Sequence, residues 1–97
     1  MVLTQLEGKV RPEHWATLKR AFAEGSLPLP SAISQSYLIQ DESERDVWRI
    51  VTIWQSRQAL QDYRASVETP GGVLMFRAVG AEPTLCISQV ISHARQD

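Results

Sequence analysis

Three side chains in this sequence could take part in chemistry: the phenol of Tyr63, the imidazole of His93 and the thiol of Cys86. Imidazole is the side chain best suited to act as a general base near neutral pH, so His93 is a candidate base. No nucleophile or carboxylate stands beside His93 in the sequence, and nothing near Cys86 would activate its thiol. We expect Cys86 to be buried and inert, and Tyr63 to be the best candidate for a functional group.

The sequence shows no pattern for a metal or a phosphate. A single cysteine cannot form an intramolecular disulfide, and no Cys/His cluster has metal-ligand spacing. Gly71-Gly72 lacks the lysine and further glycine of a phosphate-binding loop. The charged run "DESERD" (41–46) is better read as a solvated hairpin tip than as a calcium loop. We therefore predict no metal and no cofactor.

Length and charge narrow the class of protein. With 97 residues, the chain has the size of one domain, which we place at 1–97. The 10 basic and 11 acidic residues give a net charge of −1, and the basic residues are scattered. This balance predicts neither nucleic-acid nor membrane binding. No signal-like segment opens the sequence, and no apolar run reaches the ~20 residues of a membrane span, so we expect a cytoplasmic protein.

Hydrophobic periodicity predicts the secondary structure. Alternating residues predict strands at 2–7, 32–40, 46–54 and 83–94. Apolar residues at steps of three and four predict a helix over 12–25, a second helix after the N-cap Ser56, and a short third helix at 70–80. We expect Gly25 to be a left-handed C-cap and Thr69 to be the N-cap of the third helix. The order is that of an α+β, ferredoxin-like split βαβ fold, with a four-stranded antiparallel sheet and helices on one face.

The strand at 46–54 indicates how the sheet is covered. Val47, Val51 and Ile53 form one apolar face, and Trp48, Ile50 and Trp54 form the other. A strand that is apolar on both faces needs two covers, and the helices supply one. We therefore predict a homodimer through the sheet face. Alternation in the preceding strand predicts one common face for Ile33, Gln35, Tyr37 and Ile39.

Trp54 stands where the strand gives way to the helix after Ser56. A tryptophan at such a corner usually buries a large apolar area while its N–H finds an acceptor. We therefore expect Trp54 to have a packing role, with its N–H bound to a loop carbonyl.

The stretch "RIVTIWQSRQALQDYRAS" (49–66) resembles the strand-Trp-Ser-helix signature of the antibiotic-biosynthesis-monooxygenase-like proteins of the dimeric α+β barrel superfamily. The first strand, "RPEHWATLKRAF" and the last strand fit the same layout, so the resemblance covers nearly the whole chain. It implies a dimer whose sheets close into a barrel, with a pocket in each subunit between sheet and helices. In the quinone-forming branch it implies a polyphenolic substrate that is deprotonated in the pocket and reacts with dioxygen without metal or flavin.

The resemblance also indicates pocket positions. The haem-degrading branch has an Asn on the first strand, a Trp on the helix and, beyond it, the His that binds iron. The corresponding residues here are Thr4, Tyr63 and Val73, so the resemblance implies that the iron ligand is not kept. Haem degradation is therefore not expected. Thr4 and Tyr63 occupy pocket positions in the quinone-forming branch as well, and Leu74 and Phe76 are expected to form a lid. The predicted pocket residues are Thr4, Tyr63, Val73, Leu74, Phe76 and His93.

Two functions follow from the sequence, and both stay open. The first is a cofactor-independent monooxygenase acting on a small aromatic or polyketide-like molecule, with Tyr63 and Thr4 orienting it. The second is a non-enzymatic ligand-binding or stress-response dimer of the same fold. A cavity with converging polar groups favours the first, and a cavity filled with side chains favours a structural dimer. No catalytic base is assigned.

Overall fold

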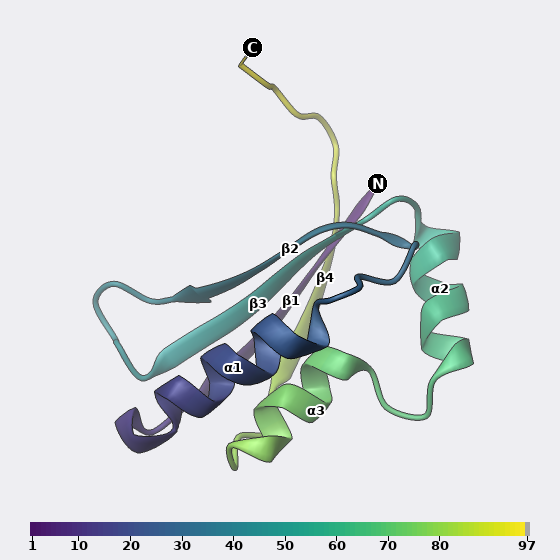
Figure 1. Ribbon diagram of the computed structural model, residues 1–97. Coiled ribbons are helices and arrows are strands. Elements are labelled where there is room, and N and C mark those ends of the chain that lie inside the picture. The colour runs from purple at the N-terminus through teal and green to yellow at the C-terminus, as the bar shows by residue number, and fades with distance from the viewer. Residues whose placement is uncertain (97) are drawn as a thin grey trace.

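The computed structural model describes residues 1–96, which form an antiparallel sheet with helices on one side (Figure 1). The elements in chain order are β1 (Val2–Lys9), a short 3-10 helix η1 (Pro12–His14), α1 (Trp15–Gly25), β2 (Ile33–Gln40), β3 (Val47–Trp54), α2 (Arg57–Ser66), α3 (Gly71–Ala78) and β4 (Thr84–Gln89). The 4-stranded sheet has the order β2-β3-β1-β4. This order confirms the predicted α+β, ferredoxin-like fold.

The pairing of the strands divides the sheet into two faces. β3 pairs with β1 and β2, and β1 pairs with β4, all antiparallel. Because directly opposed residues point to the same side, one alternate set of side chains faces the helices and the other faces away. The helix-facing set consists of Val2, Thr4, Leu6 and Gly8 of β1, and Trp48, Ile50, Thr52 and Trp54 of β3.

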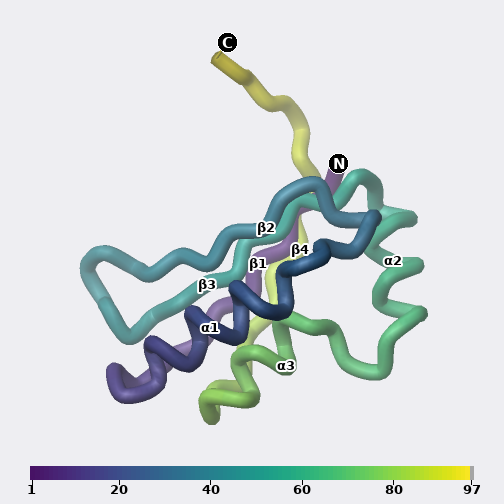
Figure 2. The backbone as a smooth tube through the Cα atoms, viewed as in Figure 1, coloured from purple at the N-terminus to yellow at the C-terminus, as the bar shows by residue number. Residues whose placement is uncertain are grey.

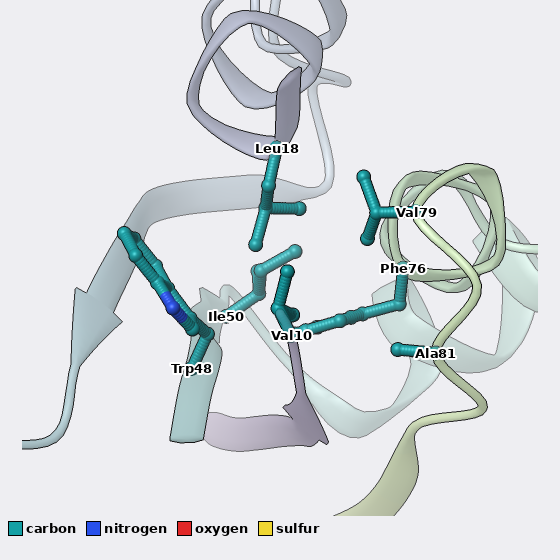
Figure 3. Packing of buried hydrophobic residues seen from close by; sticks show 7 residues of the cluster. All are labelled: Val10, Leu18, Trp48, Ile50, Phe76, Val79 and Ala81. Atoms are coloured by element: carbon teal, nitrogen blue, oxygen red, sulfur yellow. The ribbon is translucent and has the colours of Figure 1, made fainter. Parts of the chain in front are cut away.

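The main core lies between this face and helices α1 and α3 (Figure 3). Leu18 of α1 and Phe76 of α3 are both 0% exposed. The side chains of Leu18 and Phe76 point away from their helices, toward Ile50 of β3 and toward Val10, which follows β1. The buried members of this cluster are Val10, Leu18, Trp48, Ile50, Phe76, Val79 and Ala81.

A second, smaller cluster holds α2 against the end of the sheet. Its buried members are Val2, Trp54 and Leu60, and Tyr63 packs against them. The helix begins as predicted, because the Oγ of Ser56 accepts a hydrogen bond from the backbone N–H of Ala59 at 3.0 Å. Leu60 is the one residue of α2 that is fully buried, so α2 depends on this cluster for its attachment.

Strand β2 contains an irregularity that the alternation did not predict. Ile33 lies opposite Trp54, whereas Gln35 lies opposite Ile53, so β2 has one residue more than β3 at this point. Such a bulge reverses the side on which the following residues point. Ile33 therefore turns toward the helices and packs against the second cluster, and the prediction that it shares a face with Gln35 and Tyr37 was wrong.

Two helix ends also differ from the prediction. Gly25 is the last residue of α1 and does not have a positive φ; Ser26 N–H still bonds the Phe22 carbonyl at 3.0 Å, as within a helix. Within residues 1–96 the left-handed conformation is found at Gly80, with φ 77°, just after α3. Pro70, not Thr69, precedes the first residue of α3, and it provides no side-chain cap.

β4 is shorter than predicted and is an edge strand. Its ladder with β1 ends where Gln89 meets Val2, and one further hydrogen bond of 3.1 Å joins the Val90 N–H to the Met1 carbonyl. The chain after β4 runs away from the sheet, and Ile91 is 85% exposed (Figure 2). Cys86 is exposed on β4, so the expectation of a buried thiol was wrong. The reason is that Cys86 points to the face that carries no helix.

This helix-free face, hereafter the open face, carries both apolar and charged residues. Tyr37 and Ile39 of β2 are 48% and 41% exposed. At one end, Arg49 binds Glu7 at 2.7 Å and Asp41 at 3.1 Å. The backbone N–H of Glu44, together with Arg49, holds the pKa of the Asp41 carboxyl below its usual value. Asp41 is therefore ionised at neutral pH and fixes the turn between β2 and β3.

The contact between Gly8 and Phe76 generates a stability prediction. A Cβ at Gly8 would lie 2.9 Å from Cδ1 of Phe76, which is too close for a buried ring that cannot move away. We expect Gly8→Ala to lower the free energy of unfolding by about 1–3 kcal/mol, as overpacking does. Urea unfolding measures this change. In the Phe76→Leu background the same substitution should cost clearly less; equal costs in both backgrounds would contradict the proposed contact.

Candidate functional site

A cavity of about 140 Å³ lies between the helix-facing side of the sheet and the three α-helices. Its wall is mostly apolar, with Phe22 from α1, Leu60 from α2 and Met75 from α3. The edge strand β4 contributes Leu85 and Ile87, which are both partly open to solvent. The polar side chains on the wall are Thr4, Ser26, Ser36, Thr52, Trp54, Tyr63 and Arg64. An apolar cavity with a few polar groups is typical of a small-molecule site.

Three of these hydroxyls form a row across the sheet. Ser36 of β2 lies opposite Thr52 of β3, and Thr52 lies opposite Thr4 of β1. The Ser36 and Thr52 hydroxyls are hydrogen bonded at 2.9 Å, and either can be the donor. Thr4 and Thr52 are only 7% and 6% exposed. The register of the strands therefore places polar groups on the floor of an otherwise apolar cavity.

Trp54 is bound to this row. Its indole N–H donates a buried hydrogen bond of 2.9 Å to the Oγ1 of Thr4. The packing role expected of Trp54 agrees with its 5% exposure, but the acceptor is a side-chain hydroxyl on β1 and not a loop carbonyl. Thr4 is the nearer partner because both residues face the helices on adjacent strands. The Trp54 ring also packs against Tyr63, with ring centroids 5.2 Å apart.

Tyr63 links α2 to the start of α3. Its hydroxyl oxygen accepts a hydrogen bond of 3.1 Å from the backbone N–H of Gly71. This bond replaces the side-chain cap that Thr69 was expected to give. The helix start can approach the sheet because Gly72 has no side chain: a Cβ there would lie 2.7 Å from Cδ1 of Leu6.

The structure places the predicted pocket residues in three different environments. Thr4, Tyr63 and Val73 line the cavity. Leu74 is 53% exposed on α3, whereas Phe76, two residues on, is 0% exposed in the main core, so neither stands on the cavity wall. His93 is exposed in the segment after β4. The roles given to Thr4 and Tyr63 stay predictions.

Sequence reasoning missed the polar wall residues Ser26, Ser36, Thr52 and Arg64. Thr52 could have been noticed, because it is the polar member of the face that Trp48, Ile50 and Trp54 share. Ser36 could not be assigned to the helix-facing side before the register of β2 was known. Arg64 directly follows Tyr63 on α2 and is the charged residue of the cavity wall.

Two features are absent from the part of the chain that the structure describes. Across residues 1–96, no group of three or more His, Cys, Asp or Glu side chains could hold a metal ion. Over the same residues, none of the helices has the length and apolar character to cross a membrane.

The bond between Trp54 and Thr4 can be tested directly. Thr4→Val keeps the shape of the side chain but leaves the indole N–H buried without an acceptor, so we expect a loss of about 1–3 kcal/mol in the free energy of unfolding. Thr4→Ser keeps the hydroxyl and should cost less. In a Trp54→Phe background, Thr4→Val should be nearly neutral. Chemical denaturation of the unaltered chain, the three single variants and the double variant measures these differences, and equal losses for Val and Ser would contradict a structural role for the bond.

The chain matches known proteins both in sequence and in fold. The family model "Antibiotic biosynthesis monooxygenase" matches residues 1–69. No curated protein matches the chain. A Deinococcus radiodurans protein that bears the same family name has a TM-score of 0.75 at 13% identity, over 100% of this chain and 99% of its own.

Two further structures have similar folds. SnoaB, a cofactor-independent oxygenase from Streptomyces nogalater, has a TM-score of 0.73 at 12% identity, over 98% of this chain and 97% of its own. MhuD with two manganese protoporphyrin IX molecules per active site has a TM-score of 0.76 at 15% identity, over 99% of this chain and 100% of its own. At these identities the structures show the fold alone. Because the family model covers residues 1–69 of 97, the chain belongs to the antibiotic biosynthesis monooxygenase family.

Proposed function

We propose that this chain is a cofactor-independent monooxygenase that acts on a small aromatic or polyketide-like molecule. The observation that supports this proposal most is the cavity, whose apolar wall suits an aromatic body and whose hydroxyl row suits its oxygen substituents. Membership of the monooxygenase family and the likeness in fold to a cofactor-independent oxygenase also favour it.

The proposed reaction needs little from the protein. A ring CH2 of an ionised polyphenol gives its electrons to dioxygen; one oxygen atom becomes the carbonyl of the product, and the other leaves as water with the two hydrogens. The substrate is oxidised and dioxygen is the oxidant. The protein's part is to hold the ring, to donate hydrogen bonds to its oxygens and to exclude water. Tyr63 and Thr4 both line the cavity, and we assign the donation of hydrogen bonds to them.

Binding without turnover is the second candidate function. One observation favours it: the cavity wall includes no His, Asp, Glu or Cys side chain among the described residues. The wall therefore offers no side chain that could take a proton from a substrate near neutral pH. A non-enzymatic ligand-binding dimer needs no such group.

We also propose that the open face packs against the open face of a second copy. The helices cover one side of the sheet, and the other carries Val51 and Ile53 of β3 and Leu3 of β1 beside Tyr37 and Ile39. Apolar surface of this kind is stabilised by removal from water. Each copy would keep its own cavity, because the cavity lies on the opposite side of the sheet.

Replacement of Tyr63 tests the enzymatic proposal. If its hydroxyl orients the substrate, Tyr63→Phe should lower kcat/KM for a polyphenolic anthrone by about tenfold or more, which equals a loss of ~1.4 kcal/mol in transition-state stabilisation. Oxygen uptake and quinone formation provide the measurement. Tyr37→Phe is the matched control, since Tyr37 lies on the open face. Unchanged turnover in Tyr63→Phe would remove Tyr63 from the mechanism, and retained binding without oxygen uptake by the unaltered protein would favour the second function.

A charge on the open face tests the proposed dimer. Val51→Lys would place an ammonium group between the two sheets, where it must lose its hydration without a partner. We expect a dimer for the unaltered chain and a monomer for Val51→Lys in native mass spectrometry. Ala23→Lys, at an exposed position on α1, should stay dimeric. A monomeric unaltered chain, or a Val51→Lys variant that stays dimeric, would overturn this arrangement.

A further inference from the structure

Two hydroxyls of the cavity, those of Tyr63 and Thr4, have protons that no group in residues 1–96 accepts. A hydroxyl has one proton to donate and an oxygen that accepts. The Tyr63 oxygen accepts from Gly71 N–H, and the Thr4 oxygen accepts from the Trp54 indole, but neither hydroxyl donates to any described residue. Both hydroxyls are on the cavity wall, so their protons are available to a molecule inside it.

The Ser36 and Thr52 pair adds a further donor. The two hydroxyls hold two protons but share a single hydrogen bond, so one proton is left over. One hydroxyl proton is left over whether Ser36 or Thr52 is the donor. Thr52 is only 6% exposed, so a hydroxyl proton left on it has little access to water.

The charged side chain on the wall, like the hydroxyl donors, favours a negatively charged ligand. Arg64 is the charged side chain among the residues that line the cavity, and no carboxylate stands there. Arg49 and Arg77 are paired with acidic residues, whereas Arg64 takes part in none of the ion pairs within residues 1–96. Arg64 is exposed to solvent and also lines the cavity, so a charge on it faces little desolvation cost. The wall thus combines hydroxyl donors with one cation.

We propose that the cavity takes its ligand as a preformed anion, a small aromatic molecule whose acidic oxygen is ionised before it binds. The oxyanion accepts hydrogen bonds from the Tyr63 and Thr4 hydroxyls, and Arg64 compensates its charge. An anion enters an apolar cavity at an acceptable cost only when it is hydrogen bonded and paired, and this wall offers both. A phenol that bound in its neutral form could lose its proton inside the cavity only to a base on the wall, and no His, Asp or Glu stands there among the described residues. This inference takes the aromatic class of ligand from the proposed function.

The test uses 4-nitrophenol, because only its phenolate absorbs visible light. Titration of the probe from low to high pH, free and with excess protein, gives the pKa of the bound probe. We expect the bound pKa to be lower by one unit or more, which means that the phenolate binds at least tenfold more tightly than the phenol. An unchanged or raised pKa, or no binding at millimolar protein, would overturn the proposal.

Variants assign the effect to individual side chains. Arg64→Gln and Tyr63→Phe should each bring the bound pKa back toward that of the free probe. Arg57→Gln is the matched control, because it removes the same charge from the same helix and Arg57 does not line the cavity. An equal effect of Arg57→Gln would show that overall charge, and not Arg64, favours the anion. Circular dichroism of each variant checks that the fold is intact.

This experiment can fail independently of the proposed function. The probe reports binding, and it contains no ring CH2 to be oxygenated. A protein that oxygenates an anthrone but binds nitrophenol as the neutral form would keep the monooxygenase proposal and lose the anion proposal. A protein that lowers the pKa of the probe without any oxygen uptake would keep the anion proposal alone.

Discussion

The hydrogen bond from the Trp54 indole to Thr4 is the interaction on which the cavity depends. An indole N–H in an apolar environment costs free energy unless an acceptor is within reach, and the Thr4 hydroxyl meets this need at 2.9 Å across two paired strands. With its N–H fixed, the indole ring packs on Leu60 and beside Tyr63, and these are the contacts that attach α2. The position of Tyr63 in turn sets the start of α3 through Gly71.

The one-sided cover of the sheet separates two tasks. The helix-facing side of β3 carries the large aromatic residues Trp48 and Trp54 and forms both core clusters and the cavity floor. The open side of the same strand carries the smaller apolar residues Val51 and Ile53. Because a β-strand sends alternate residues to opposite faces, one sequence segment serves both tasks without conflict. The proposed assembly and the proposed ligand binding can therefore be tested separately.

Periodicity was sufficient to predict the order of the elements, because strands and helices of this length repeat their apolar residues at clearly different steps. It failed where a contact across the chain decides the local structure. Ile33 faces the helices because of a bulge that only the pairing with β3 defines. The N-terminal N–H of α3 is bound by Tyr63, eight residues earlier in the sequence, where a local Thr69 cap had been expected.

The candidate site was predictable in part, for a related reason. Thr4 and Tyr63 came from a resemblance to a family pattern, and both line the cavity. The partners that complete the wall, Ser36 and Thr52, are 16 residues apart in sequence and meet only through strand register. Periodicity also cannot rank the residues of a short helix: Leu74 and Phe76 are close in sequence, yet one faces solvent and the other fills the core.

In the proposed anion site, Thr4 and Tyr63 each serve both the fold and the ligand. In each, the oxygen accepts a hydrogen bond that holds the structure together, while the proton stays available on the cavity side. The indole N–H of Trp48 is different: it is buried among core residues, has no hydrogen-bond partner within residues 1–96, and lies outside the cavity wall. No ligand in the cavity could relieve that loss. An acceptor that enters the cavity, in contrast, completes the hydrogen bonding of hydroxyls whose positions the fold has already fixed, so little ordering of the protein is needed when it binds.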